Sequence, residues 1–326
     1  MLLLSRSDVK SAVTMQDAIE AAEAALAAYS AGRARIPIRV SVQAPEGITL
    51  FMPGLIADGG ALGLKVVSVF ARNPERGLPT ITALMVLNDV ETGEPIAAME
   101  AGYLTALRTG AASGVATRYL ARSDADTVTV IGAGVQARTQ LQAVLAVRPC
   151  KRAFVFDVSR AAAEGFAREM SGALGVDIAA VRDVNAAVAQ SDIVITATTS
   201  KTPVFDGRSL KQGTHVNAVG AYTPEMQELD ATTVCRADRF VADSREAVWE
   251  EAGDLIIPLR NGLINENRVD AEVGDLALGR APGRTDPNQI TVYKGVGLAA
   301  LDLGAAKLVY DRAIARNIGT KIDLLS

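Results

Sequence analysis

A glycine-rich turn between a strand-like segment and a helix-like segment constrains this chain more than any other feature. Residues 127–131 (Thr-Val-Thr-Val-Ile) form an apolar, β-branched run that is typical of a buried strand. The run 132–137 (Gly-Ala-Gly-Val-Gln-Ala) follows directly, and an amphipathic helical pattern continues beyond it. A strand, a Gly-x-Gly-x-x-Ala turn and a helix in this order indicate a dinucleotide-binding unit.

Each small residue of this turn has a physical task. Gly132 permits the tight turn, Gly134 lets the backbone approach a pyrophosphate, and Ala137 keeps the helix close to the sheet. The helix N-terminus offers free N–H groups and a partial positive charge to the phosphates. The alternative is a glycine turn in an α/β fold that binds no cofactor. We predict that Gly132, Gly134, Val135, Gln136 and Ala137 bind the cofactor.

The ends of three further strands extend this predicted site. The second strand ends at Asp157, and an acidic residue there binds the ribose hydroxyls and repels a 2′-phosphate, which favours NAD(H). Arg160 lies near enough to tolerate NADP(H), and Asp157 as a helix N-cap is the alternative interpretation. Thr198, Val219 and Gly220 end later strands, where ligands of such sheets bind, so we expect them to flank the nicotinamide.

Strand and helix patterns alternate through the second half of the chain. This alternation predicts an α/β fold with a doubly wound parallel sheet, the Rossmann arrangement. The predicted strands are 128–131, 153–157, 193–197, 216–219, 240–242 and 289–296, and the predicted helices are 137–146, 160–171 and 184–190.

The first 100 residues have a different texture. A helix is predicted over 18–30, after the cap-like Thr14, and a mostly antiparallel sheet follows it, with one strand ending at Pro53-Gly54. A long helix of small residues over 101–121 links the two halves, and a last helix over 298–314 packs back on the first. The predicted domains are therefore 1–120, joined by 299–326, and 121–298. The predicted strands of the first domain are 39–42, 50–52, 63–70 and 80–88, with a hairpin turn at 91–94.

Bulk composition excludes several classes of protein. A net charge of −4 gives no general attraction to nucleic acid or to an anionic membrane. The opening apolar run is too short for a signal peptide, and no run of 18 apolar residues is present, so we expect a cytoplasmic protein. The chain has two cysteines, expected as reduced thiols, and one histidine, His215, expected to pack at a strand start. We expect no metal site.

Several short motifs, in the right order over almost the whole chain, resemble the ornithine cyclodeaminase/mu-crystallin family. The resemblance implies hydride transfer between nicotinamide C4 and a carbon that bears both nitrogen and a carboxylate. It also implies a homodimer that forms through the N-terminal domain, which would bind the substrate. The motifs are 63–66 (Gly-Leu-Lys-Val), 73–74 (Asn-Pro), 77–80 (Gly-Leu-Pro-Thr), 105–113 (Thr-Ala-Leu-Arg-Thr-Gly-Ala-Ala-Ser), 217–220 (Asn-Ala-Val-Gly) and 228–230 (Glu-Leu-Asp).

The resemblance also assigns individual residues. Arg39, Lys65 and Arg108 match the positions that hold the substrate carboxylate, and Thr80 and Thr109 match cofactor contacts. Arginine suits a carboxylate because its planar fork donates two parallel hydrogen bonds. A lysine beside two arginines has a lowered pKa, which would let it relay a proton. The alternative for each cation alone is a solvated surface charge.

One position departs from the family pattern. Cyclodeaminases and alanine dehydrogenases of this family carry an aspartate where this chain has Tyr222. The mu-crystallin-like ketimine reductases, like this chain, lack that aspartate. A tyrosine is a poor base at neutral pH but is able to donate a hydrogen bond. Asp230 and Glu225 remain candidate bases, and Asp230 as a helix cap is an equal alternative.

We therefore predict reduction of a small cyclic ketimine by NAD(P)H, with NAD(H) preferred. The predicted substrate is delta-1-pyrroline-2-carboxylate, which gives L-proline, or delta-1-piperideine-2-carboxylate, which gives L-pipecolate. Arg39 and Arg108 would hold the carboxylate, and Lys65 would supply the proton. The alternatives are an ornithine or lysine cyclodeaminase, an alanine dehydrogenase, and a mu-crystallin-like protein that binds NAD(P)H without catalysis.

Overall fold

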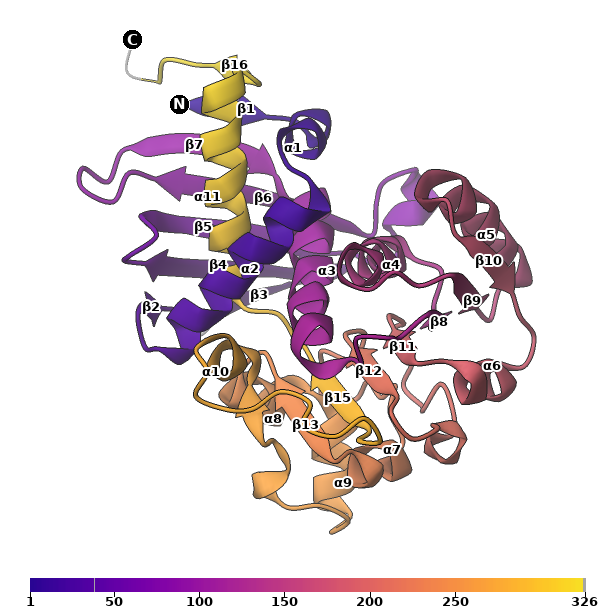
Figure 1. Ribbon diagram of the computed structural model, residues 1–326. Helices are drawn as coiled ribbons and strands as arrows, with labels where there is room; N and C mark the ends of the chain where they lie inside the picture. Colours follow the sequence, from indigo (N-terminus) through magenta and orange to yellow (C-terminus); the bar gives the residue numbers. More distant parts are fainter. Residues whose placement is uncertain (38, 325–326) are drawn as a thin grey trace. The chain divides into compact units, whose positions relative to one another are not determined.

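The computed structural model describes residues 1–37 and 39–324, which form two compact units (Figure 1). Unit 1 comprises Met1–Arg108 and Leu298–Ser326, and unit 2 comprises Thr109–Gly297. The boundary lies inside helix α3 (Ala101–Leu120), whereas the sequence suggested a boundary at the end of this helix.

Unit 1 contains the mostly antiparallel sheet that the sequence predicted. Each neighbouring pair of strands is antiparallel except β1 and β7, which are parallel. The strands run in the order β16 (Thr320–Lys321), β1 (Leu2–Leu4), β7 (Pro95–Glu100), β6 (Ile81–Asn88), β5 (Ala61–Val69), β4 (Gly47–Ile56) and β2 (Ala34–Arg35), and β3 (Val40–Ala44) pairs with β4.

The prediction that a strand ends at Pro53-Gly54 is wrong. Strand β4 continues through both residues, and they pair with Leu64 and Gly63 of β5. A Cβ on Gly54 would lie 2.8 Å from a methyl group of Leu303, so this glycine marks close packing of a helix on the sheet. The sequence alone does not distinguish a glycine that ends a strand from a glycine that allows a helix to pack closely on the sheet.

Three helices accompany this sheet. Helix α2 (Met15–Ser30) starts at the predicted cap Thr14, whose side chain and that of Asp17 form a capping box. Helix α11 (Ala299–Arg316) packs on α2 and on strands β4, β5 and β6, so the last helix does return to the first part of the chain (Figure 1). The third helix is α1 (Arg6–Ala12). A short 3-10 helix, η1 (Asn73–Arg76), is also present.

Unit 2 is built on the predicted doubly wound sheet, and its eight strands are all parallel. The strand order reverses between β8 and β11, and ligands of such sheets bind beyond the carboxyl ends of the strands at that point. The strands run in the order β10 (Asp177–Ala180), β9 (Arg152–Phe156), β8 (Thr127–Ile131), β11 (Ile193–Thr196), β12 (His215–Ala218), β15 (Thr291–Lys294), β13 (Arg239–Ala242) and β14 (Ala271–Glu272).

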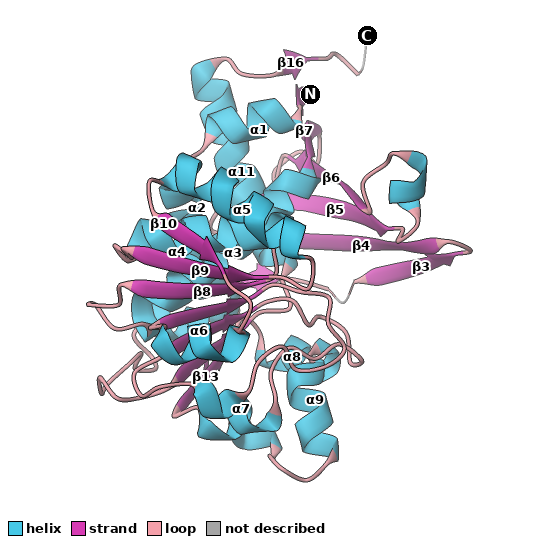
Figure 2. Ribbon diagram, turned by 90° about the vertical axis from the view of Figure 1, so that its right-hand side faces the viewer, coloured by secondary structure: helices cyan, strands magenta, loops and turns pink. Residues whose placement is uncertain are grey.

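Three helices of unit 2 match the prediction, and four were missed. Figure 2 shows the predicted helices beside the sheet; they are α4 (Val135–Val147), α5 (Arg160–Leu174) and α6 (Val184–Gln190). The missed helices have five to eight residues each. They are α7 (Ala231–Arg236), α8 (Arg245–Glu251), α9 (Gly253–Arg260) and α10 (Val273–Ala277), and the 3-10 helices η2 (Gly207–Ser209) and η3 (Glu266–Arg268) lie among them.

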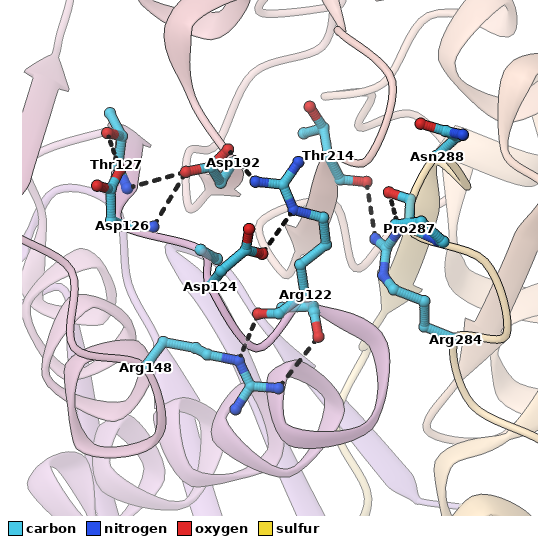
Figure 3. Close-up of polar contacts among 12 residues, drawn as sticks. Arg122, Asp124, Asp126, Thr127, Arg148, Asp192, Thr214, Arg284, Pro287 and Asn288 are labelled. Carbon is cyan, nitrogen blue, oxygen red and sulfur yellow. Dashed lines mark hydrogen bonds and ion pairs between the residues drawn. The ribbon is translucent and has the colours of Figure 1, made fainter.

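Three arginines lie near the amino-terminal ends of strands in this sheet. Figure 3 shows Arg122, Arg148 and Arg284 beside Asp126, Asp192 and Thr214, which precede β8, β11 and β12. Arg148 donates to the carbonyls of Ala121 and Arg122, and Arg284 donates to the carbonyl of Leu120 at 2.7 Å. These carbonyls lie at the end of helix α3 or directly after it and have no partner within it, so the guanidinium groups act as caps. The depression in which Arg122 and Arg284 lie is therefore structural.

His215 begins β12 and is fully buried, as the sequence predicted. Its Nδ1 lies 3.0 Å from Thr291 Oγ1, and its Nε2 lies 3.1 Å from Asn217 Oδ1. Burial lowers its pKa to about 3, so the ring stays neutral. Within residues 1–37 and 39–324, no cluster of side chains suits a metal ion, and no helix has the length and apolar character needed to cross a membrane.

Candidate functional site

The glycine loop at the end of β8 has the geometry that a pyrophosphate requires. Gly132 adopts φ +102°, and a Cβ there would lie 2.6 Å from the carbonyl oxygen of Ala197. Gly134 is the N-cap of α4, and a Cβ on it would meet nothing within 4 Å, so the space above it is open. Ala137 is fully buried in the core between helix and sheet, whereas Val135 is 66% exposed. These residues fit a dinucleotide.

Arg138 prepares the loop for an anion. Its Nη1 donates to the carbonyls of Ala133 and Gly134, at 2.7 and 2.9 Å, and Glu169 holds the other edge of the guanidinium. The guanidinium thus offsets the partial negative charge of these two carbonyl groups. The N–H groups at the start of the helix are then available to bind phosphate oxygens. Arg138 was not singled out from the sequence.

Asp157 lies beside this loop, immediately after β9. Its Oδ2 accepts from the backbone N–H of Ala133 at 2.8 Å, and its Oδ1 accepts from that of Ser159 at 2.8 Å. The N-cap of α5 is Ser159, so the alternative in which Asp157 caps that helix is wrong. Arg160 is paired with Glu164 at 2.6 Å. The carboxylate has lone pairs left for ribose hydroxyls.

Glu228 ties together the ends of β11 and β12, where Thr198, Val219 and Gly220 lie. One carboxylate oxygen accepts from the Thr198 N–H at 2.6 Å, and the other accepts from the Gly220 N–H at 2.7 Å. The hydroxyls of Thr196 and Thr198 also donate to this carboxylate. Glu228 thus fixes the backbone of the two loops that were expected to flank a nicotinamide.

A buried charge cluster supports Glu228. Asp254 Oδ1 accepts from the backbone N–H groups of Glu228 and Leu229, and Asp254 Oδ2 lies 2.8 Å from Lys294 Nζ. Burial raises the pKa of Glu228, and the Lys294 ammonium opposes this rise. Sequence reasoning missed Asp254 and Lys294; the only available signal was a lysine at the end of an otherwise apolar strand.

In unit 1, Lys65 and Arg108 meet at a residue that the sequence did not single out. Lys65 Nζ lies 2.7 Å from Asp302 Oδ2, and Arg108 Nε donates to Asp302 Oδ1 at 2.9 Å. All three side chains are at least 92% buried, which excludes the alternative of solvated surface charges for Lys65 and Arg108. The available signal was one charged residue in the apolar run 299–303 (Ala-Ala-Leu-Asp-Leu).

The pKa of Lys65 is lowered to about 8, in the predicted direction. Burial is the main cause, because an ammonium loses its hydration in the core; Asp302 opposes the shift, and Arg108 and Arg39 add to it. The prediction ascribed the lowering to the two arginines, which are in fact the smaller causes. Arg39, half-buried before β3, is thus close enough to Lys65 to act on its charge.

The other predicted residues come from several elements. Thr80 precedes β6 in unit 1, and the carbonyl of Thr109 in α3 accepts from Gln140 Nε2 at 3.0 Å. Tyr222 is 40% exposed on the loop after β12. Asp230 is the N-cap of α7: its two oxygens accept from the backbone N–H groups of Thr233 and Gly207, at 2.7 and 3.0 Å. Asp230 therefore has the capping role weighed from the sequence.

An open glycine loop on a doubly wound sheet, together with a unit that buries a lysine and an arginine, defines the class of nicotinamide-dependent oxidoreductases of small carboxylates. Comparison with known proteins narrows this class. The model of the ornithine cyclodeaminase/mu-crystallin family matches residues 1–317, and the chain belongs to that family.

Three relatives illustrate the similarity. The Delta(1)-pyrroline-2-carboxylate reductase of Bacillus cereus is 39% identical over 325 residues, which cover 99% of this chain and all of the relative. The structure of the Thermococcus litoralis Delta(1)-pyrroline-2-carboxylate reductase in complex with NADH and L-proline has a TM-score of 0.95 and 44% identity, with coverage of 99% and 100%. An archaeal alanine dehydrogenase dimer with bound NAD has a TM-score of 0.93 and 35% identity, with coverage of 100% and 99%.

Proposed function

We propose that this protein reduces a cyclic ketimine carboxylate with NAD(P)H. The observation that carries the proposal is the buried Lys65–Asp302–Arg108 cluster, because it holds two cations, one of them a proton-bearing amine, in one place. The relatives named for pyrroline-2-carboxylate reduction favour delta-1-pyrroline-2-carboxylate as substrate and L-proline as product. Delta-1-piperideine-2-carboxylate, which would give L-pipecolate, is the second candidate.

In this mechanism the cations of unit 1 bind the substrate and supply its proton. Arg108 and Arg39 hold the carboxylate, because guanidinium groups form paired charge-assisted hydrogen bonds with it. Lys65 donates a proton to the imine nitrogen, and a pKa of about 8 suits this donation because most of the amine is protonated at neutral pH. Tyr222 contributes a hydrogen bond at most.

Unit 2 binds the cofactor, which supplies a hydride when bound. The N–H groups at the start of α4 hold the pyrophosphate, and Asp157 accepts from the ribose hydroxyls, which favours NAD(H) over NADP(H). Thr198, Val219 and Gly220 flank the nicotinamide, and Thr80 and Thr109 add contacts to the cofactor.

A cyclodeaminase or alanine dehydrogenase needs a base that this chain does not offer at the family position. Tyr222 replaces the aspartate, both oxygens of Asp230 are held by backbone N–H groups, and Glu225 is exposed. Reduction of a preformed imine needs no such base, which favours the reductase.

A substrate panel tests the proposal. With delta-1-pyrroline-2-carboxylate we expect oxidation of NADH and, in a parallel assay, of NADPH. Both oxidation rates are expected to exceed the rate of NAD reduction with ornithine or alanine. Release of ammonia from ornithine at a higher rate would refute the reductase. Tight NADPH binding without turnover of any substrate would instead identify a binding protein.

We also propose that unit 1 forms a homodimer through the sheet face that α11 does not cover. Val66 of β5 pairs with Phe51 of β4 and Leu84 of β6, and Leu84 is 46% exposed. An antiparallel sheet with apolar residues on its open face favours a partner, and a second copy fits because the alanine dehydrogenase relative is a dimer. Light scattering is expected to give a dimer for the wild type and a monomer for Leu84→Lys with Val42→Lys.

The cytoplasm is the proposed location. Cys150 and Cys235 are free thiols, and free thiols persist in reducing compartments. Fractionation of cells that express the untagged chain tests this location, and recovery of the protein with exported proteins would refute it.

A further inference from the structure

Asp302 lies between two cations in the core of unit 1. It projects from α11, whereas Lys65 comes from β5 and Arg108 from α3, so one carboxylate joins three elements. Each oxygen serves one cation: Oδ2 is 2.7 Å from Lys65 Nζ, and Oδ1 is 2.9 Å from Arg108 Nε. The side chain of Asp302 is 1% exposed, so bulk solvent does not reach it.

The way in which Asp302 binds Arg108 leaves part of the guanidinium for another anion. Asp302 uses Nε, and within the described residues the structure records no hydrogen bond from either Nη atom of Arg108. The two Nη atoms form the outer fork that binds a carboxylate in a bidentate manner. Lys65 likewise gives one of its three N–H donors to Asp302, and the structure records no other hydrogen bond from its Nζ to the residues that it describes.

We propose that Asp302 is a positioning residue for the reaction: it holds Lys65 as the proton donor and reserves the Nη fork of Arg108 for the substrate carboxylate. This inference rests on the proposed reductase function. In the step, hydride bonds to the imine carbon, the C=N π pair moves to nitrogen, and nitrogen takes a proton from Lys65 Nζ while NADH becomes NAD⁺. Lys65 is then a neutral amine that still donates to Asp302 and regains its proton from solvent.

The charges around Lys65 set the pH range of this donor. Asp302 faces it from α11, Arg108 from α3 and Arg39 from the segment before β3, and Asp302 is the anion among them. Reductase activity is expected to fall as pH rises through the pKa of Lys65, about 8. Without the carboxylate, burial and the two arginines lower this pKa further, so the fall begins at a lower pH.

The test compares Asp302→Asn, Asp302→Glu and a control, Asp311→Asn, across a range of pH. Asp311 lies on the same helix and pairs with Lys307 at the surface, so its variant is expected to match the wild type. For Asp302→Asn, kcat/KM for the imine is expected to fall roughly 100-fold, in the range of lost general acid catalysis, and the alkaline limb moves to lower pH. The affinity for NADH, measured by fluorescence, stays unchanged and shows that the variant is folded.

Asp302→Glu separates charge from position. It keeps the carboxylate, so the alkaline limb returns toward that of the wild type, but the extra methylene displaces Lys65 and kcat remains reduced. An Asp302→Glu variant with wild-type kcat would overturn the positioning role, even if Asp302→Asn does not fold. An Asp302→Asn variant with the wild-type pH profile, or one that loses NADH and imine affinity equally, would also overturn it.

A binding measurement keeps this test separate from the proposed function. A wild type that reduces no imine refutes the reductase but leaves the arrangement of Arg108 to be tested. Calorimetry with pyrrole-2-carboxylate, a planar ring carboxylate that cannot be reduced at a C=N bond, then compares the wild type with Asp302→Asn. An affinity of Asp302→Asn for this ligand at least roughly tenfold below that of the wild type supports the reserved fork. The reason is that the charge-assisted pair between Arg108 and the ligand carboxylate is then lost. Equal affinity of the two proteins, or no binding by the wild type, overturns it.

Discussion

Gly132 lies so close to Ala197 that a Cβ on Gly132 would be 2.6 Å from the carbonyl oxygen of Ala197. The φ of Gly132, +102°, is also one that other residues rarely adopt. We therefore expect Gly132→Ala to displace the loop and to weaken NADH binding by at least about 10-fold, because a phosphate site depends on backbone N–H positions. Titration of cofactor fluorescence measures this change.

Gly165→Ala is the matched control for this substitution. Gly165 lies within helix α5, and an added Cβ would meet nothing within 4 Å. The variant is expected to bind NADH like the wild type and to gain about 0.5–1 kcal/mol in stability, since alanine favours a helix over glycine. Equal NADH affinity of the Gly132 and Gly165 variants would contradict the role of the loop.

Glu228→Gln is expected to loosen the ends of β11 and β12. The amide nitrogen of glutamine would face a backbone N–H, of either Thr198 or Gly220, because each carboxylate oxygen now accepts from one of them. A buried donor left without an acceptor costs about 1–3 kcal/mol. Urea unfolding is expected to show this loss, and the KM for NADH is expected to rise more than the KM for the imine.

Glu164→Gln serves as the control for Glu228→Gln. Glu164 has a side chain that is 44% exposed and pairs with Arg160 on the same helix, and solvent-exposed pairs contribute little to stability. We expect its unfolding curve to match that of the wild type. If the two glutamine variants unfold at the same urea concentration, the hydrogen bonds of Glu228 to the two strand ends contribute nothing to stability.

His215 is expected to make the protein less stable in mild acid. Its pKa is about 3 in the folded protein and near 6.5 when unfolded, so the unfolded state binds the extra proton. Stability is full above pH 6.5 and falls with pH below it, by about 2 kcal/mol at pH 5 for one such group. Urea unfolding at pH 7 and pH 5 measures this loss.

The variant His215→Gln isolates this effect, because the chain has a single histidine. The variant is expected to start from lower stability, since two hydrogen bonds change, but to lose much less of it between pH 7 and pH 5. Titration of carboxyl groups, including Glu228, is common to both proteins and cancels in the comparison. A parallel loss in wild type and variant would show that His215 becomes charged without unfolding.

The two cysteines are expected to differ in reactivity. Burial raises the pKa of the Cys150 thiol to about 12, whereas Cys235 is exposed. Thiolate is the reactive form, so iodoacetamide at pH 8 is expected to label only Cys235 in the native protein and both residues after denaturation. Mass spectrometry counts the labels. Cys235→Ser is expected to take no label when native, and rapid labelling of this variant would contradict the burial of Cys150.

The elements that were predictable from the sequence are those whose evidence is local. Strand β8, the glycine loop and the start of α4 are contiguous, so their periodicity and turn chemistry are readable in one short stretch. Asp157 follows from its place at the end of the next strand. The edge strand β10 was missed because it has four residues, of which only Ile178 is buried.

The contacts at the site depend instead on tertiary structure. Lys65 and Asp302 are 237 positions apart, and no pattern near Lys65 indicates which carboxylate will neutralise it. The same holds for Glu228, whose neighbours in sequence show no sign that it receives N–H groups from two strand ends. Helix α7 has six residues, and its one signal in the sequence was the cap Asp230.

The return of α11 to unit 1 sets an order of events during protein synthesis. When the ribosome has completed β5 and α3, Lys65 and Arg108 exist but their shared carboxylate has not been made. A nascent chain that stops before residue 298 would have to bury two cations without Asp302, and its first strand would lack its β16 partner. We therefore expect unit 1 to complete its core only near the end of translation, after the whole of unit 2 has emerged.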